Sequence, residues 1–458
     1  MRRLHTHFII IALLFAGIAD RVLAQEVATP LSLQACMEYA LKHNYNIKNA
    51  ELDVLIQKAQ IGEQLSASYP HVNGKMDVND FYVPQSSFID ASTFPSSDPK
   101  APPVPKGTIV PISFTVPYAA DASITTSQLL FDGQVFIAIK ARKALLDFAK
   151  IRGAVTEENI RYNVYKAYNS LVIAYRQYDI IKNSLIYARS LEHDVIVTQQ
   201  NGFAEKIDVE RTSVQVNNLA TDSMRIGNML TVAEQMLKYQ IGMNINTPIV
   251  LTDTSVEVRK DNTLSLLEET EHYERVPEYN LYTQTLTLNE FNLKRYQLAA
   301  YPSINAFWAY GTNYGSTKFG DLFLFNKYDR NSTLGISLTM PIFNGFLRAN
   351  QVTEARLNIE KSKNDIENIK QTIDFQTATS RTTLRNAVLQ VQSQRRNMEL
   401  SDDVLDLARR KYKAGVGSNV EVTQAQTDQL RAQTGYFNAL LDLINAEADL
   451  KKALGLLK

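Results

Sequence analysis

Apolar residues recur at helical spacing along two long stretches of the chain. In the first stretch they step by four and three residues, without interruption, from Ile160 to Ala188. In the second, alanines recur at every seventh position from Ala425 to Ala453, with leucines between them. Such steps place apolar side chains on one helix face, and a heptad seam of this kind is typical of coiled coils. The small alanines predict close approach of neighbouring helices.

The prolines leave these same stretches free. All fourteen lie at or before Pro341, and none falls between Pro117 and Pro248. A proline inside a helix costs about 3 kcal/mol, so proline-free stretches permit very long helices. Each stretch is broken at one Gly- and Asn-containing turn, at 199–206 and at 414–419. We therefore predict, twice, a helix of about 65 residues, which reaches roughly 100 Å, then a turn and a returning helix of about 35.

Elsewhere polar and apolar residues alternate with a period of two. The alternation predicts four strands, at about 70–83, 112–130, 302–314 and 332–341. Strands of about ten residues that are polar on one side and apolar on the other suit a membrane β-barrel. Half-buried strands in a soluble sheet fit the same alternation. Trp308, Tyr310, Tyr314 and Phe319 flank these strands and favour the membrane interpretation, because aromatic residues gather at membrane interfaces.

The two halves of the chain repeat each other. The segment Ala67–Asn73 (ASYPHVN) corresponds to Ala299–Asn305 (AAYPSIN), and Leu129–Gln134 corresponds to Pro341–Phe346. The turn segments correspond as well, with Gly202 matching Gly415. Corresponding residues lie 232 positions apart at the first pair of segments and 212 apart at the second. The first copy is therefore about 20 residues longer between these two segments. The extra residues fall in 83–111, a proline-rich segment that we interpret as an irregular loop joining two strands, with a proline-rich ligand motif as the alternative.

The predicted fold class is mostly α with a membrane β-barrel contribution, built from an internally duplicated strand–strand–long helix–turn–helix unit. The predicted organisation is as follows: a signal peptide at 1–24; a first repeat at 25–242, with a helical hairpin at about 135–242; a linker at 243–263; and a second repeat at 264–458, with a hairpin at about 346–456.

The amino terminus has a basic start, a short apolar run and a small-residue cleavage site after Ala24. This order is typical of a secretory signal peptide, and the apolar run is shorter than the roughly 20 residues that a membrane anchor needs. The chain is therefore expected to be exported. A balance of 48 acidic and 48 basic residues with no basic block argues against nucleic acid as a partner.

The sequence gives little support to chemistry at a defined site. The single Cys36 has no cysteine with which to form an intrachain disulfide, and the six histidines are scattered without metal-ligand spacing. No phosphate-binding glycine loop or nucleophile pattern occurs. We predict no enzyme activity, no cofactor and no metal site.

The predicted strands demand an oligomer if they enter a membrane. Four strands are too few to close a barrel, and an open sheet edge in lipid leaves backbone groups without hydrogen-bond partners. The smallest common barrels have eight strands, so at least two chains would have to contribute. Physical argument alone does not choose between two chains and three.

The exported, duplicated unit resembles the TolC-type outer membrane efflux proteins. The resemblance runs from Leu31–Asn44 to Ala453–Leu457 and is most specific at the turns with their flanks, Gln199–Gln215 and Arg410–Gln426. It implies a homotrimer in a Gram-negative bacterium, with one shared twelve-stranded barrel in the outer membrane and a trimeric α-barrel extending through the periplasm. It also implies docking on a periplasmic adaptor (membrane fusion) protein and an inner-membrane pump of RND or ABC type.

The resemblance places the functional residues at the two turns. It implies a pore constriction or gate at Asp208, Glu421, Tyr412 and Gln424, and an adaptor-contact tip at Gly202, Phe203, Gly415 and Val416. Gln424 stands where a second family carboxylate would be, and Gly417 where some members place a closure-locking arginine. Asp208 and Glu421 are equally suited to simple stabilisation of a helix N-terminus, and turn geometry alone explains the two glycines.

The expected function is that of a passive exit duct of a tripartite efflux or type I secretion system, multidrug efflux included. The alternative is an exported coiled-coil structural or adhesion protein without a membrane barrel. The substrate, and the choice between efflux and protein secretion, would depend on partners that this sequence does not encode.

Overall fold

The computed structural model describes residues 29–83, 85–93, 102, 104–252 and 265–457. The chain divides into two compact units, each made of several segments. The first, the helical unit, comprises residues 1–56, 147–285 and 362–458. The second, the sheet unit, comprises residues 57–146 and 286–361. The predicted signal peptide at 1–24 lies outside the described residues.

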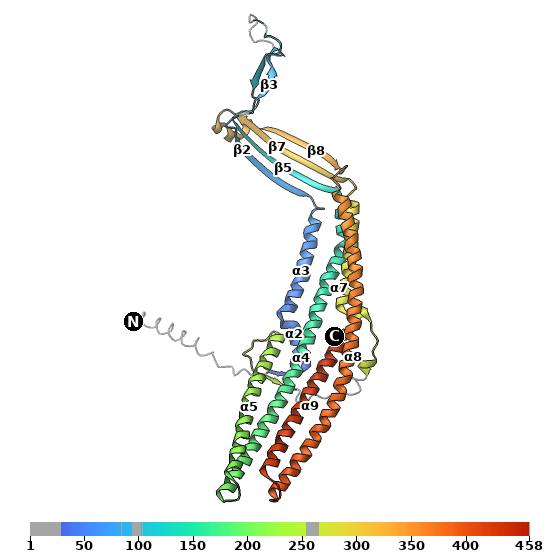
Figure 1. Cartoon of the computed structure of the whole chain (residues 1–458). Helices are drawn as coiled ribbons and strands as arrows, with labels where there is room; N and C mark the ends of the chain where they lie inside the picture. The colour runs from blue at the N-terminus through green and yellow to red at the C-terminus, as the bar shows by residue number, and fades with distance from the viewer. Residues whose placement is uncertain (1–28, 84, 94–101, 103, 253–264, 458) are drawn as a thin grey trace, which may run out of the picture. The chain divides into compact units, whose positions relative to one another are not determined.

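Four long helices dominate the chain, at the positions expected from the apolar periodicity. α4 (Gly133–Gln200) has 68 residues and α8 (Leu347–Lys413) has 67. Each is followed by a shorter helix, α5 (Lys206–Ile241) with 36 residues and α9 (Asn419–Ala453) with 35. The shorter helices α2 (Leu33–His43), α3 (Tyr45–Ser66) and α7 (Pro277–Leu298) are also labelled in Figure 1.

The apolar seams of the sequence form the contacts between these helices. Ile181 and Ala188 of α4 pack against Val216 and Leu219 of α5. Leu384 of α8 packs in the same way against a set from α9, namely Leu443, Ala446 and Leu450. α4 and α9 meet through Ile173, Leu440 and Ile444. In Figure 1, α4 and α9 lie between α5 and α8.

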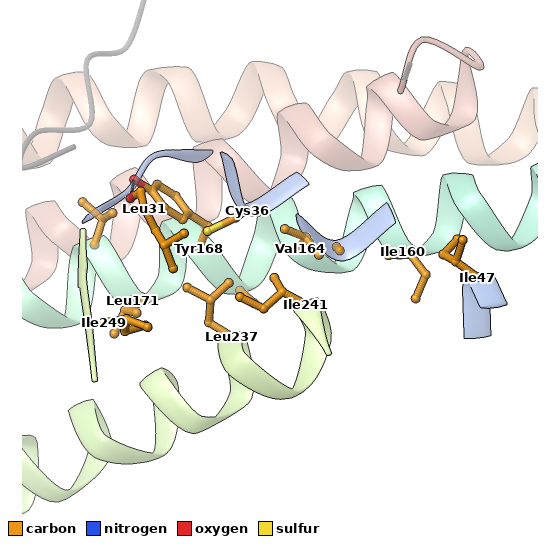
Figure 2. Close-up of a cluster of buried hydrophobic side chains, with 13 residues drawn as sticks. Leu31, Cys36, Ile47, Ile160, Val164, Tyr168, Leu171, Leu237, Ile241 and Ile249 are labelled. Carbon is orange, nitrogen blue, oxygen red and sulfur yellow. Dashed lines mark hydrogen bonds between the residues drawn. The ribbon is translucent and has the colours of Figure 1, made fainter. Parts of the chain in front are cut away.

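The largest cluster of buried apolar side chains joins α2, α4 and α5. Figure 2 shows Cys36 of α2, Val164 and Leu171 of α4, and Leu237 and Ile241 of α5 directed toward one another. A short parallel pair, β1 (Thr29–Leu31) with β6 (Ile249–Leu251), closes one side of this cluster. The sequence pattern did not predict this pair, because three-residue strands are too short to show an alternation.

The sheet unit contains one antiparallel sheet of four strands in the order β2–β5–β7–β8. β2 spans His71–Asp80, β5 Tyr118–Phe131, β7 Ser303–Ser316 and β8 Asp329–Thr339. Because the order has two ends, β2 and β8 are edge strands. Each helix that precedes a Tyr-Pro pair ends just before it, α3 at Ser66 and α7 at Leu298, as expected for a proline that keeps the preceding residue out of helix.

The register gives this sheet one apolar and one polar face. Paired residues share a face, so the pairs Gly74–Ile124, Ile124–Tyr310 and Trp308–Leu334 define one side of all four strands. That side carries a series of exposed large apolar side chains: Val72, Met76, Val78, Ile124, Trp308, Tyr310, Leu334, Ile336 and Leu338. The opposite side carries mostly polar residues, among them Asn73, Lys75, Asp77, Asp121, Ser123, Asn313, Asn331 and Thr333.

The proline-rich insertion contains more order than the irregular loop that we expected. β3 (Ser87–Asp90) pairs with β4 (Ile109–Ile112) as an antiparallel hairpin. The Asp90 carboxylate accepts hydrogen bonds from the backbone N–H groups of Ser92 and Gly107, at 2.9 and 3.0 Å, and so fixes the end of the hairpin. The tip residues 94–101 and 103 lie outside the described part of the chain.

Within the described residues, no helix combines the length and the apolar character needed to span a membrane.

Candidate functional site

The two interhelical turns have the same backbone geometry. Gly202 and Gly415 both adopt the left-handed conformation, with φ of 78° and 73°. At the first turn, the N–H of Phe203 donates to the carbonyl of Thr198 at 3.0 Å. At the second, the N–H of Val416 donates to the carbonyl of Lys411 at 3.1 Å. Both are Schellman caps, in which a glycine takes the left-handed position that a side chain would strain.

The residue after each turn glycine is apolar and exposed. In a Schellman cap this residue commonly packs back onto the last helical turn. Here Phe203 is 86% exposed and Val416 78% exposed. Turn geometry explains the glycines but not an apolar side chain held in solvent at both tips. Such side chains are available for contact with another protein.

The helices that leave the turns begin with similar but not identical caps. The Asp208 carboxylate accepts a hydrogen bond from the backbone N–H of Glu205 at 3.3 Å, across the first turn of α5. In α9 the Ser418 hydroxyl accepts from the N–H of Glu421 at 3.2 Å. Asp208 and Glu421 therefore occupy the same helical position. Both are placed to stabilise the positive end of a helix.

The structure brings two of the four predicted gate residues together. Tyr412 packs into a cluster that includes Leu191 of α4, Leu405 of α8 and Val422 of α9. Burial raises the pKa of the Tyr412 phenol, and the negative charges of Asp194 and Asp208 raise it further. Because those charges act on the phenol, Tyr412 lies in the electrostatic neighbourhood of Asp208. The phenol stays protonated at neutral pH and can donate a hydrogen bond.

Glu421 and Gln424 form a separate, exposed group on α9. The Gln424 amide donates to the Asp428 carboxylate at 3.0 Å, one helical turn further on. Both predicted residues are exposed on the single chain. Tyr412, by contrast, is half-buried between helices of its own chain.

The position of Gly417 has a structural reason. A Cβ atom there would lie 2.9 Å from the Cβ of Lys411 and 3.0 Å from the backbone nitrogen of Tyr412. Glycine thus allows the turn to fold tightly against the end of α8. An arginine at this position would require the turn to open.

Sequence reasoning missed three residues beside Tyr412. The guanidinium carbon of Arg409 stacks over the ring of Tyr187, 3.7 Å from the centroid, and joins α8 to α4. Asp194 of α4 contributes the charge next to Tyr412. These residues are brought together only by the packing of the two hairpins, and no local motif signals that contact. Among the described residues, no three His, Cys, Asp or Glu side chains are grouped so that they could hold a metal ion.

Comparison with known proteins identifies this architecture. Residues 294–456 match the family model described as Outer membrane efflux protein. A comparison with curated proteins gives no match.

Several solved structures share the fold. The outer membrane protein VceC from Vibrio cholerae is 14% identical, with a TM-score of 0.68 over 92% of this chain and 96% of that one. The CmeC outer membrane channel of Campylobacter jejuni is 17% identical, with a TM-score of 0.71 over 92% and 85%. The open state of the MtrE outer membrane channel of Neisseria gonorrhoeae is 18% identical, with a TM-score of 0.67 over 93% and 89%. The resemblance to the TolC-type outer membrane efflux proteins is therefore confirmed, by the family match over residues 294–456 and by a fold that these channels share with more than nine tenths of the chain.

Proposed function

We propose that this chain is the outer membrane exit duct of a tripartite efflux or type I secretion system. In this proposal three copies form one channel, located in the outer membrane of a Gram-negative bacterium with a long periplasmic extension. The channel conducts passively, and a periplasmic adaptor and an inner-membrane pump of RND or ABC type supply the energy and select the substrate.

The observation that carries the proposal is the two-faced sheet with open edges. Its apolar face leaves Leu334, Ile336 and Leu338 more than 60% exposed on one strand alone. A patch of this kind on a soluble protein promotes aggregation, but it suits contact with lipid. The polar face, which bears Lys75 and Asp121, suits a water-filled interior.

The open edges β2 and β8 lead to the oligomer. In lipid, the backbone groups of both edges need partners, and an edge of another copy provides them. The strands alternate in direction from β2 to β8, so β8 of one copy and β2 of the next are antiparallel in a closed ring. Three copies of four strands give twelve, the number implied by the family resemblance.

Exposed apolar side chains on the outer helices support the same assembly. On α5 they are Val214, Met229, Val232 and Met236, and on α8 they are Leu389, Leu400, Val404 and Leu407. In this proposal α5 of one copy packs against α8 of the next. The α-barrel is then closed by the same kind of seam that joins α4 and α9 within a copy.

The turns provide the gate and the docking tip in this proposal. Asp208 and Glu421 contribute rings of carboxylates at the periplasmic constriction, and Tyr412 and Gln424 take part in closing it. Like charges about 4 Å apart repel by about 1 kcal/mol in water and by more beside a low-dielectric wall, so such rings favour cations. Gly202, Phe203, Gly415 and Val416 meet the adaptor.

Two measurements test the duct. The full chain is expected in the outer membrane fraction, to need detergent for extraction, and to conduct ions in planar bilayers. The variant Asp208→Ala with Glu421→Ala is expected to show weaker cation preference. Extraction without detergent would favour the coiled-coil structural protein instead. Conductance with unchanged ion selectivity would remove both carboxylates from the constriction and leave the duct in place.

A further inference from the structure

The loop between β7 and β8 carries aromatic residues on both of its sides. Toward β5, the ring of Phe319 contacts Tyr118, with 5.6 Å between centroids, and Phe323 packs on Phe319 at 5.8 Å. Toward β8, Phe325 stacks on Tyr328 at 5.8 Å, and Tyr328 contacts Tyr314 at 5.4 Å. The β5 side of this loop thus contacts its own chain through Phe319, which is 51% exposed. On the β8 side, Phe325 remains 72% exposed.

The segment that follows β2 is also apolar and exposed. It continues the β2–β5 ladder beyond the sheet, since the N–H of Phe81 donates to the carbonyl of Pro117 at 2.7 Å. Beyond this bond, Tyr82 is 95% exposed, Val83 85% and Phe88 73%. We call Tyr82, Val83 and Phe88 the β2 arm. Tyr82 and Val83 lie between β2 and the hairpin β3–β4, and Phe88 lies in β3 itself.

The strand order relates these two surfaces. β2 ends at Asp80, which pairs with Tyr118, and Tyr118 pairs with Ser316 at the end of β7. The β2 arm and the β7–β8 loop therefore leave the same end of the sheet. They leave from opposite edges of it, because β2 and β8 are the two edge strands. Closing the sheet with another copy brings the β8 edge of one chain beside the β2 edge of the next.

We propose that the β2 arm of one copy packs against Phe325 of the neighbouring copy and forms an aromatic contact that locks the subunits at the outer end of the sheet. This inference rests on the proposed shared barrel and adds the contact surface between its copies. Within one chain the loop already covers the start of β5 through Phe319. At the junction between β8 of one copy and β2 of the next, the other side of the loop covers the β2 arm in the same way, with Phe325 in place of Phe319.

Lipid alone does not account for the exposed arm. A membrane strand needs about 9–11 residues, and β2 already has ten. Phe88 lies eight residues beyond Asp80, up to about 25 Å further in an extended chain. An extended chain of that length carries the side chain past the roughly 30 Å hydrocarbon layer that β2 spans in this proposal. An aromatic residue kept 73% exposed on the single chain at that distance points to cover by protein.

Disulfide cross-linking of the full chain in native membranes tests the contact. In a Cys36→Ser background, which removes the single natural cysteine, the pair Tyr82→Cys with Phe325→Cys is expected to oxidise to covalent dimers and trimers. The matched control pairs Tyr82→Cys with Phe319→Cys. Phe319 lies on the same loop but faces its own Tyr118, so this pair is expected to give no covalent oligomer.

A reference pair separates this inference from the shared barrel. Asn73→Cys of β2 is combined in turn with Thr333→Cys and Ser337→Cys of β8, and one of these pairs is expected to bridge copies. If a reference pair bridges and the Tyr82–Phe325 pair does not, the arm contact is wrong and the shared barrel stands. If neither the reference pairs nor the Tyr82–Phe325 pair bridges copies, the arm contact and the shared barrel are both wrong. In a Trp308→Phe background, which removes the natural tryptophan of the apolar face, strong quenching of a Tyr82→Trp variant by brominated lipid would show that lipid covers the arm, which also overturns the inference.

Discussion

The helical unit and the sheet unit use the same kind of amphipathic pattern and satisfy it in different ways. The clusters of buried apolar side chains found among the described residues lie in the helical unit. There, Leu384 and Leu450 are fully buried by helices of the same chain. In the sheet unit the apolar face stays exposed, with Leu334 at 80%. The helical unit buries a core within one chain, although α5 and α8 keep exposed apolar side chains, whereas the sheet unit leaves an apolar face and two strand edges uncovered.

The largest effect is expected from a charge on the apolar face of the sheet. Ile336→Arg places a guanidinium where the proposal has lipid, which costs about 2–4 kcal/mol per chain near the bilayer midplane. We expect loss of the chain from the outer membrane fraction. Ser337→Arg is the matched control, because the neighbouring residue points to the polar face. Equal behaviour of the two variants would mean that the two faces of the sheet do not meet different surroundings.

A large effect is also expected inside the helical unit. Leu384 of α8 is fully buried, and Leu384→Ala is expected to lower the free energy of unfolding by about 2–5 kcal/mol. Leu357→Ala makes the same change on an exposed site of the same helix that is not assigned to the seam between copies, and it is expected to cost clearly less. Chemical denaturation followed by circular dichroism measures both. A Leu357→Ala cost as large as that of Leu384→Ala would contradict the core assigned here.

A smaller, pH-dependent effect is expected at Glu158 of α4. Burial raises the pKa of this carboxyl to about 7, while Lys452 lowers it and Glu278 raises it. The folded chain then binds the proton more tightly than an unfolded chain with a pKa near 4.5. Stability is therefore lost as the pH rises from about 4.5 to about 7. Each unit of pKa shift corresponds to about 1.4 kcal/mol.

Thermal unfolding of the wild type and Glu158→Gln between pH 4 and pH 8 measures this loss. We expect the melting temperature of the wild type to fall relative to the variant as the pH rises. The difference is expected to level off above the folded-state pKa. Parallel pH profiles for the two proteins would show that Glu158 titrates as in an unfolded chain.

The smallest effect on stability is expected at the two tips. Phe203→Ser with Val416→Ser replaces apolar side chains that are almost fully exposed, so the free energy of unfolding should change by less than about 0.5 kcal/mol. Export is nevertheless expected to fall, because the tips would contact the adaptor. Lys206→Ser serves as the control, because Lys206 begins α5 directly after the turn that contains Phe203, and this variant is expected to keep normal export. Normal drug resistance or secretion in the double variant would remove Phe203 and Val416 from the docking surface.

Much of the fold is visible in the sequence because long elements repeat their pattern many times. The seam from Ile160 to Ala188 lies within α4, Gly133–Gln200, and the alanine series from Ala425 to Ala453 lies within α9, Asn419–Ala453. The alternation around Val72–Val78 and Leu334–Leu338 located β2 and β8. What the sequence missed is short or non-local. β1 and β6 have three residues each, and the hairpin β3–β4 has four-residue strands within a proline-rich segment.

The candidate site was predictable only in part, for a related reason. The glycines of the two turns and the acidic residues six positions later are local signals. The neighbourhood of Tyr412 is not, because Asp194 and Tyr187 approach it from α4 through the packing of separate hairpins, and Arg409 of α8 stacks on Tyr187 across the same contact. Spacing along one helix carries no information about such a contact.

The central claim is that several copies complete the sheet. The most direct test is the mass of the protein extracted in mild detergent, measured by native mass spectrometry with the sheet content followed by circular dichroism. We predict a particle of three chains. A single chain that keeps its four-stranded sheet in detergent would contradict the account.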